Sequence, residues 1–181
     1  LVLVEETSDK LLDKLEHGHI DLALLALPYQ TEKFHTQVLA KDHFSLVHHK
    51  DYSPAKGVED FNLLPDASVF LLEREHCMTG HALSACHLNR SSCINPFEAA
   101  SLHTLLSMVE HQLGVTFLPQ MAINAGILKD KNMIATPSQG DAYRDIGILW
   151  RKTTGRIRDF KLFSQQLEVF LARQCSLDFE S

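Results

Sequence analysis

The amino-acid sequence predicts an α/β protein made of two lobes, and two features of the chain lead to this prediction. Continuous apolar runs, typical of buried strands, alternate along the 181 residues with segments whose apolar side chains recur at helical spacing. Candidate linkers at "VLAKDHF" (38–44) and "SQGDAYRD" (138–145) can serve as crossovers between lobes. Residues 1–41 and 145–181 then form lobe I and residues 42–144 form lobe II, a binding-protein-like architecture with a cleft between the lobes.

The first predicted elements are a strand, a helix and a second strand. Leu1–Val4 is apolar and predicts a strand that is in progress at the first residue. We therefore expect the chain to be a fragment of a larger protein. Ser8 or Asp9 can cap a helix with leucines on one face, and Gly18 can end it. The apolar run "IDLALLAL" at 20–27 predicts a buried strand. This order of elements indicates a parallel α/β unit.

The alternation of strands and helices continues to the end of the chain. Strands are predicted at 44–49, 68–73 and 114–119, and helices at 77–88 and 99–113. Another buried strand is predicted at 145–152. The last predicted helix carries an amphipathic stripe formed by Ile157, Phe160, Phe163, Leu167, Phe170 and Leu171.

Charge and composition limit the classes of function. The formal net charge is −6, from 17 Lys and Arg against 23 Asp and Glu, which argues against direct contact with nucleic-acid phosphates. No apolar run reaches the roughly 18 residues of a membrane span, and no secretory signal is visible. Four cysteines are too few for a disulfide-rich secreted scaffold. We expect a soluble cytoplasmic protein with reduced thiols and no membrane partner.

The segment "EREHCMTGHALSACHL" at 73–88 concentrates ionisable and nucleophilic side chains. A metal site, a redox pair, or a helix with buried cysteines would each explain it. Because a helix is predicted to begin at or beside Cys77, the helix macrodipole and unpaired backbone N–H groups favour the thiolate of this residue. His76 can add a hydrogen bond or a positive charge. Cys77 is therefore a candidate reactive cysteine.

The spacing of the two cysteines in this segment leaves two interpretations open. Cys86 follows Cys77 by nine residues, which in a continuous helix separates their Cα atoms by about 13 Å, whereas a disulfide tolerates about 7 Å. Either the two thiols never meet, or their bonding drives a structural switch. Cys77 and His81 share a helix face, but the closely paired ligands of structural zinc sites are absent. No metal and no cofactor are expected.

The same segment resembles the redox segment of OxyR-type regulators, the peroxide-sensing branch of the LysR-type transcriptional regulators. A His-Cys pair is followed by a second cysteine at the ninth position, with small and apolar residues between. The stretches "EETSDKLLDKLEHGHIDLALLAL", "EAASLHTLLSMVEHQLGVTFLP" and "YRDIGILWRKTTGRIRDFKLF" also resemble parts of that family's effector domain. The resemblance covers nearly the whole chain and implies the two-lobed, periplasmic-binding-protein-like fold of LysR-type effector domains.

The resemblance implies a role for each matching residue. Cys77 would be the peroxidatic thiol, whose thiolate attacks the O–O bond and becomes a sulfenic acid, and Cys86 would resolve that acid into a disulfide. His76 would orient or stabilise the reacting group. Thr7 matches a hydroxyl near the peroxide, and equally well a residue that starts a helix. Arg144 matches an arginine whose charge favours the thiolate, and is otherwise a charged linker residue.

The resemblance also implies partners for the intact protein. Hydrogen peroxide would be the signal, and the regulatory domains would form homodimers within a homotetramer. Promoter DNA would be bound by a winged helix-turn-helix before Leu1, where the first strand and helix of the effector domain are also expected. RNA polymerase and a thiol reductant are further implied partners. The implied function is not that of an enzyme, because a sensor needs only stoichiometric thiol chemistry.

Glu75 departs from the family pattern, in which glycine precedes the His-Cys pair. A carboxylate two residues before Cys77 can disfavour the thiolate, or can hold a water or the histidine against the peroxide. We hypothesise that Glu75 tunes peroxide sensitivity. Cys93 and Cys175 are expected to be bystanders. Two alternative functions stay open: a LysR-type domain that binds a small metabolite in its cleft, and a thiol peroxidase.

Overall fold

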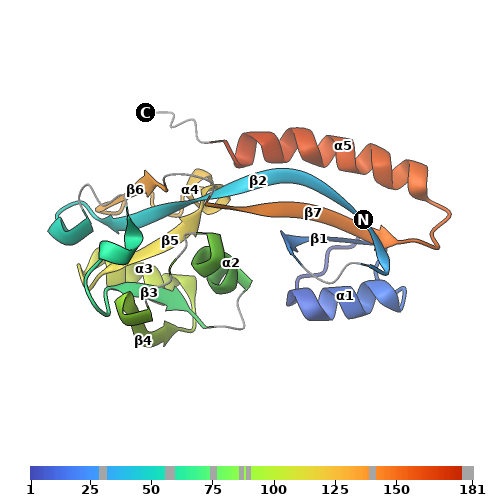
Figure 1. Ribbon diagram of the computed structural model, residues 1–181. Coiled ribbons are helices and arrows are strands. Elements are labelled where there is room, and N and C mark those ends of the chain that lie inside the picture. Colours follow the sequence, from blue (N-terminus) through green and yellow to red (C-terminus); the bar gives the residue numbers. More distant parts are fainter. Residues whose placement is uncertain are drawn as a thin grey trace. The chain divides into compact units, whose positions relative to one another are not determined.

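The computed structural model describes residues 1–28, 32–55, 60–73, 77–85, 88, 91–138 and 142–176. The described chain divides into two compact units (Figure 1). Unit 1 comprises Leu1–Lys41 and Arg144–Cys175, and unit 2 comprises Asp42–Tyr143 and Ser176–Ser181. Two strands pass from one unit into the other, β2 (Phe34–His49) and β7 (Tyr143–Arg151).

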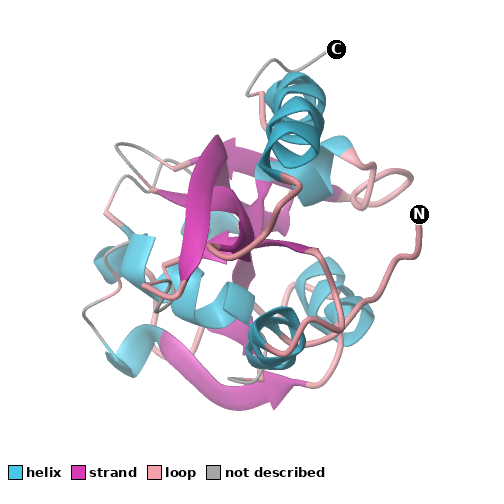
Figure 2. Cartoon of the chain, turned by 90° about the vertical axis from the view of Figure 1, so that its right-hand side faces the viewer, coloured by secondary structure: helices cyan, strands magenta, loops and turns pink. Residues whose placement is uncertain are grey.

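Unit 1 is a small sheet with a helix on either side. Its strands lie in the order β1-β7-β2, where β1 (Leu22–Leu27) runs antiparallel to β7. Helix α1 (Ser8–Glu16) packs on one face through Leu15, which is fully buried against Leu149. Helix α5 (Ile157–Gln174) covers the other face, where the Phe160 and Trp150 rings lie 6.2 Å apart. Figure 2 shows these layers from another side, with strands in magenta and helices in cyan.

The strand predicted at Leu1–Val4 is wrong. Residues 1–7 lie outside helices and strands, and the side chains of Leu1, Val2 and Leu3 are at least 85% exposed. A strand forms only where a neighbour accepts and donates its backbone hydrogen bonds, and β1 makes its described pairing with β7 instead. The expected parallel pairing of these two segments is therefore absent from the described residues.

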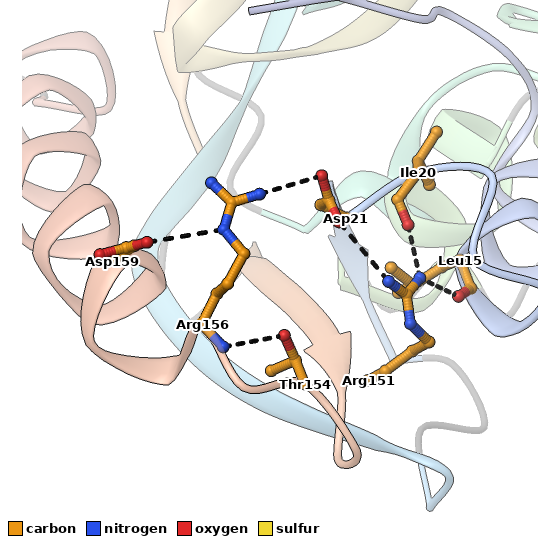
Figure 3. A network of polar contacts seen from close by, with 7 residues as sticks. All are labelled: Leu15, Ile20, Asp21, Arg151, Thr154, Arg156 and Asp159. Atoms are coloured by element: carbon orange, nitrogen blue, oxygen red, sulfur yellow. Dashed lines mark hydrogen bonds and ion pairs between the residues drawn. The ribbon is translucent and has the colours of Figure 1, made fainter.

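Arg151 fastens the end of α1 to the sheet of unit 1 (Figure 3). Its Nη1 donates to the carbonyl oxygens of Leu15 at 2.7 Å and Ile20 at 2.6 Å. The Leu15 carbonyl is among the last four of α1, which lack a partner four residues ahead in the helix, and the Ile20 carbonyl lies in the connection from α1 to β1. Gly18 follows the helix with φ of +79°, which confirms the prediction that it ends α1. The helix begins one residue earlier than predicted, with Thr7 as its N-cap.

Unit 2 contains a mixed sheet in the order β6-β2-β5-β3-β4. The strands added here are β3 (Val69–Leu72), β4 (Ile94–Ala99), β5 (Val115–Pro119) and β6 (Met133–Pro137). Strand β3 runs parallel to both of its neighbours, and β2 runs antiparallel to β5 and β6. The helices are α2 (Cys77–Ala85), α3 (Leu102–Glu110) and α4 (Gln120–Asn124), with short 3-10 helices at Ser53–Ala55, Phe61–Leu63 and Ser91–Cys93.

Two hydrophobic cores enclose the sheet of unit 2, because successive residues of β3 point to opposite faces. Val69 and Leu71 face a core that includes Ala82 of α2, whereas Phe70 and Leu72 face α3. The stretch at 38–44, expected to be a crossover between lobes, lies within the continuous strand β2, and the boundary between the two units falls inside it. None of the helices in the described part of the chain has the length and apolar composition needed to cross a bilayer.

Candidate functional site

The candidate site begins where β3 ends. Every residue from Val69 to Leu72 is buried, and α2 begins at Cys77, five residues after the end of the strand. The prediction that a helix starts at or beside Cys77 is confirmed. Because β3 is parallel to both neighbours, Leu72 lies at the carboxyl end of parallel strands, where α/β folds commonly place their sites. Cys77 is therefore held at such an end by the strand that precedes it.

One buried hydrogen bond ties the first turn of α2 to this strand end. The Thr79 hydroxyl donates to the Leu72 carbonyl oxygen at 2.8 Å, and Thr79 is 5% exposed. Thr79 is the third residue of the helix, two positions after Cys77. The bond thus joins the last residue of β3 to the turn that begins with Cys77. Sequence reasoning missed this contact.

Two buried threonines make equivalent bonds where α2 meets the sheet. A narrow gap that has no room for a water molecule is lined by Leu71, Leu72, Thr79, Ala82, Leu105, Thr116 and Phe117. The Thr116 hydroxyl of β5 donates to the Phe70 carbonyl oxygen at 2.9 Å, as the Thr79 hydroxyl does to that of Leu72. Protein interiors are usually packed this closely, so each hydroxyl bonds to a carbonyl oxygen of β3.

The described part of α2 buries little side-chain volume. Ala82 is 1% exposed and contributes a single methyl group, and Leu83 is only partly buried. A Cβ atom added at the exposed Gly80 would meet nothing within 4 Å. Glycine in a helix interior costs about 1 kcal/mol relative to alanine. The structure therefore presents α2 as a short helix of low intrinsic stability.

Several predicted site residues fall outside what the structure describes or are divided between its units. Glu75, His76 and Cys86 lie outside the described residues. Thr7 is exposed and caps α1 in unit 1 through its backbone carbonyl, which accepts from Leu11 at 3.0 Å, and its side chain makes no capping bond. Arg144 is partly buried near the start of β7, also in unit 1. That these two residues meet Cys77 of unit 2 stays a prediction.

A buried polar cluster that the sequence did not reveal anchors α4 in unit 2. The fully buried Asp42 accepts from the backbone N–H of Met121 at 3.0 Å. The Ser45 hydroxyl donates to Gln120 at 3.4 Å, and Gln120 in turn donates to Asn124 at 2.8 Å. These contacts satisfy the start of a short helix, so their role is structural. Within the described residues, no three His, Cys, Asp or Glu side chains gather closely enough to hold a metal ion.

Comparison with known proteins relates the whole chain to transcription regulators. The family model described as the LysR substrate binding domain matches residues 1–171. The transcriptional regulator EstR of Acinetobacter baylyi is 36% identical over 95% of this chain and 58% of its own length. A probable hydrogen peroxide-inducible genes activator of Mycobacterium avium is 31% identical over 96% of the chain and 59% of its own length.

A solved structure agrees with these relatives. The reduced form of the regulatory domain of OxyR2 from Vibrio vulnificus is 43% identical, with a TM-score of 0.84 over 91% of this chain and 78% of that one. The predicted fold class, a two-lobed effector domain of the LysR type, is confirmed by these matches. The chain spans less than two thirds of the length of the relatives EstR and the Mycobacterium avium activator.

Proposed function

Because the chain belongs to the family of LysR substrate-binding domains, we propose that it is the peroxide-sensing regulatory domain of a LysR-type transcriptional activator. One observation supports the proposal above all others: α2 begins at Cys77, five residues after the carboxyl end of a buried parallel strand. This location gives a thiolate the positive end of a helix macrodipole and backbone N–H groups without intrahelical partners. The name of the Mycobacterium avium relative, a probable hydrogen peroxide-inducible genes activator, supports peroxide as the signal.

The proposed chemistry uses one molecule of hydrogen peroxide for each chain. The thiolate sulfur of Cys77 attacks one peroxide oxygen, the O–O bond breaks, and hydroxide leaves with the electron pair, so the product is a sulfenic acid. The thiolate of Cys86 then attacks the sulfur of that acid and displaces hydroxide, which forms the Cys77–Cys86 disulfide. Together with two protons the two hydroxides become two molecules of water. Two thiols are oxidised and one peroxide is reduced.

The length of α2 supports a structural switch as the output of this chemistry. A helix places the Cα atoms of its ends, here Cys77 and Ala85, about 12 Å apart. A disulfide tolerates at most about 7 Å between Cα atoms. Bonding Cys77 to the residue after Ala85 therefore requires α2 to unwind or bend. In this proposal the unwound segment is the signal that the regulator transmits.

The neighbouring residues are proposed to assist this reaction. His76 orients the reacting group, and Thr7 and Arg144 contribute a hydroxyl and a positive charge at the peroxide. Residues 1–41 with 145–181 and residues 42–144 are proposed to be the two lobes of one effector domain. Support for this arrangement comes from the division of the described chain into units at Lys41 and Arg144.

The intact protein is proposed to act in the cytoplasm as a homotetramer with paired regulatory domains. A winged helix-turn-helix outside this chain would bind promoter DNA, and the switch would change contact with RNA polymerase. A thiol reductant would return the disulfide to two thiols. The match to EstR and to the peroxide-inducible activators supports transcription regulation as the output.

Titration with peroxide tests the proposed function. We expect one equivalent of hydrogen peroxide to join Cys77 and Cys86, detected by mass analysis of thiol-blocked peptides, and Cys86→Ser to stop at the sulfenic acid. Cys93→Ser is the matched control, because this thiol is fully buried in the core of unit 2. Unmodified thiols would favour a small metabolite as the ligand, and rapid continued consumption of peroxide with a thiol reductant would favour a peroxidase. Either result refutes the proposal.

A separate measurement addresses Glu75. We propose that its carboxylate tunes the sensitivity of Cys77 to peroxide. The second-order rate constant for Cys77 oxidation should therefore change in Glu75→Gly, while Glu73→Gly, two residues earlier and exposed, should leave it unchanged. An identical rate constant for Glu75→Gly and the unsubstituted chain would dismiss the role of Glu75.

A further inference from the structure

The first turn of α2 has one described polar attachment to the sheet, the bond from the Thr79 hydroxyl to the Leu72 carbonyl oxygen. Because Thr79 is 5% exposed, water does not compete strongly for either partner. Ala82, the other deeply buried residue of α2 whose side chain is described, lies almost one turn further along the helix. Its methyl group packs in the core that includes Val69 and Leu71 of β3. Among the described residues, the Thr79 bond is thus the polar contact that seats the turn beginning with Cys77 on the end of β3.

We propose that Thr79 is a positioning residue for the peroxide reaction. Its hydrogen bond keeps the first turn of α2 wound and seated on the end of β3, so that the backbone N–H groups of the turn that begins with Cys77 keep a fixed arrangement. Thr79 does not touch peroxide in this account and acts only through the backbone that carries Cys77. The inference rests on the proposed function, since it concerns the rate of the same thiol chemistry.

The chain provides a matched control for this role. Thr116 lines the same gap, is 1% exposed, and donates to the carbonyl oxygen of Phe70 on the same strand as Leu72. It belongs to β5 and not to α2. Replacement of either threonine by valine removes one buried hydroxyl and preserves its shape. The two variants should therefore lose similar amounts of folding stability, but only the change at position 79 releases the helix that carries Cys77.

The experiment measures the first oxidation step alone. Each variant is made in the full chain with Cys86→Ser, so that the reaction stops at the Cys77 sulfenic acid, which a 1,3-diketone traps for mass analysis. We expect Thr79→Val to react about fivefold more slowly with hydrogen peroxide, the factor that corresponds to one net hydrogen bond. Thr79→Ser, which keeps the donor, and Thr116→Val should react at the rate of the Cys86→Ser parent.

The pH profile separates positioning from general stability. If the N–H groups in the first turn of α2 stabilise the thiolate, Thr79→Val should move the midpoint of the curve of Cys77 oxidation rate against pH to a higher pH. Thr116→Val should leave that midpoint unchanged. Thermal unfolding of each variant shows which chains are folded during the assay. If Thr79→Val proves unstable, Thr79→Ala replaces it as the variant without the hydroxyl donor, and both rates are then measured at a lower temperature. Thr79→Ser, which keeps the donor, should react as fast as the parent under the same conditions.

Distinct outcomes overturn the inference and the proposed function. A rate for Thr79→Val within twofold of the parent, with an unchanged pH profile, overturns the positioning role and leaves peroxide sensing intact. Equal slowing by Thr79→Val and Thr116→Val also overturns it, because the effect would then depend on stability alone. No sulfenic acid in the Cys86→Ser parent overturns the proposed function itself.

Discussion

Replacing Gly80 with alanine tests whether α2 unwinds when the disulfide forms. Gly80 lies in the second turn of the helix, is exposed, and leaves room for a Cβ atom, since nothing lies within 4 Å of the position it would occupy. The substitution therefore adds no clash and buries almost no surface. Its main effect is on the backbone entropy lost when the helix forms, which is smaller for alanine than for glycine.

The expected magnitude is set by helix propensity. Alanine favours a helix interior over glycine by about 0.8–1.0 kcal/mol. If α2 is helical with reduced thiols and unwound with the disulfide, Gly80→Ala stabilises the reduced state alone by this amount. For a two-electron couple, 30 mV corresponds to about 1.4 kcal/mol, so the reduction potential of the Cys77–Cys86 pair should rise by about 20 mV. If unwinding precedes bond formation, disulfide closure should also slow about fivefold.

Equilibration with glutathione buffers of known potential measures this shift, with the fraction of disulfide read from the mass of thiol-blocked chains. Gly155→Ala is the matched control: its added Cβ also meets nothing within 4 Å, but the residue lies between β7 and α5, outside any helix. We expect its potential to equal that of the unsubstituted chain. A shift of Gly80→Ala below about 5 mV, or toward lower potential, would refute unwinding at this position.

Further predictions concern the stability of the two units, each read from urea unfolding. Gly114→Ala should cost about 3 kcal/mol, because its Cβ would lie 2.1 Å from the Ser68 carbonyl oxygen. Arg151→Lys should cost about 1.5 kcal/mol, since lysine cannot reproduce both bonds to carbonyls near the end of α1; Arg156→Lys, 61% exposed, should cost less than about 0.5 kcal/mol. Burial raises the pKa of Tyr52 above its ordinary value of 10.0, so the folded chain favours the neutral phenol. The free energy of unfolding should therefore fall as pH rises through that pKa, and this fall should be smaller in Tyr52→Phe.

Strands that are buried on both faces were predictable from sequence, because their apolar runs are local signals. The prediction at 68–73 corresponds to β3 and that at 114–119 to β5. Residues 34–43 of β2 and all of β4 and β6 escaped prediction, since their residues are mixed in polarity and their pairing depends on distant partners. Pro96 within β4 argues against a strand, and is tolerated because β4 lies at the edge of the sheet.

The last helix shows how packing modifies an amphipathic pattern. The helix predicted from the apolar stripe corresponds to α5, and Phe160 and Leu171 of that stripe are buried. Phe163 and Phe170 are 40% and 56% exposed. Periodicity indicates which residues share a helix face, but how much of that face is covered depends on the neighbouring elements. The sequence alone therefore could not show that Phe163 and Phe170 stay exposed.

The candidate site was predictable only in part, for a similar reason. The start of a helix at Cys77 is indicated by a buried strand and the segment of helical spacing after it. The bond between Thr79 and Leu72 joins residues seven apart whose meeting depends on how the strand end and the helix pack. A threonine at the third position of a helix after a buried strand is the signal that could have suggested it.

Thr79 and Gly80 are adjacent in sequence and act on α2 in opposite ways. A switch requires two conformations whose free energies differ by only a few kcal/mol, since a ligand or reaction can shift an equilibrium only by its differential effect on the two states. A tightly packed helix would stay wound after Cys77 is oxidised, and a helix without attachment would not hold Cys77 ready for peroxide. The buried Thr79 bond secures the first turn, whereas Gly80 lowers the stability of the turns that follow. Combining Thr79→Ser with Gly80→Ala should therefore leave the rate of the first oxidation step unchanged and slow only the closure of the disulfide.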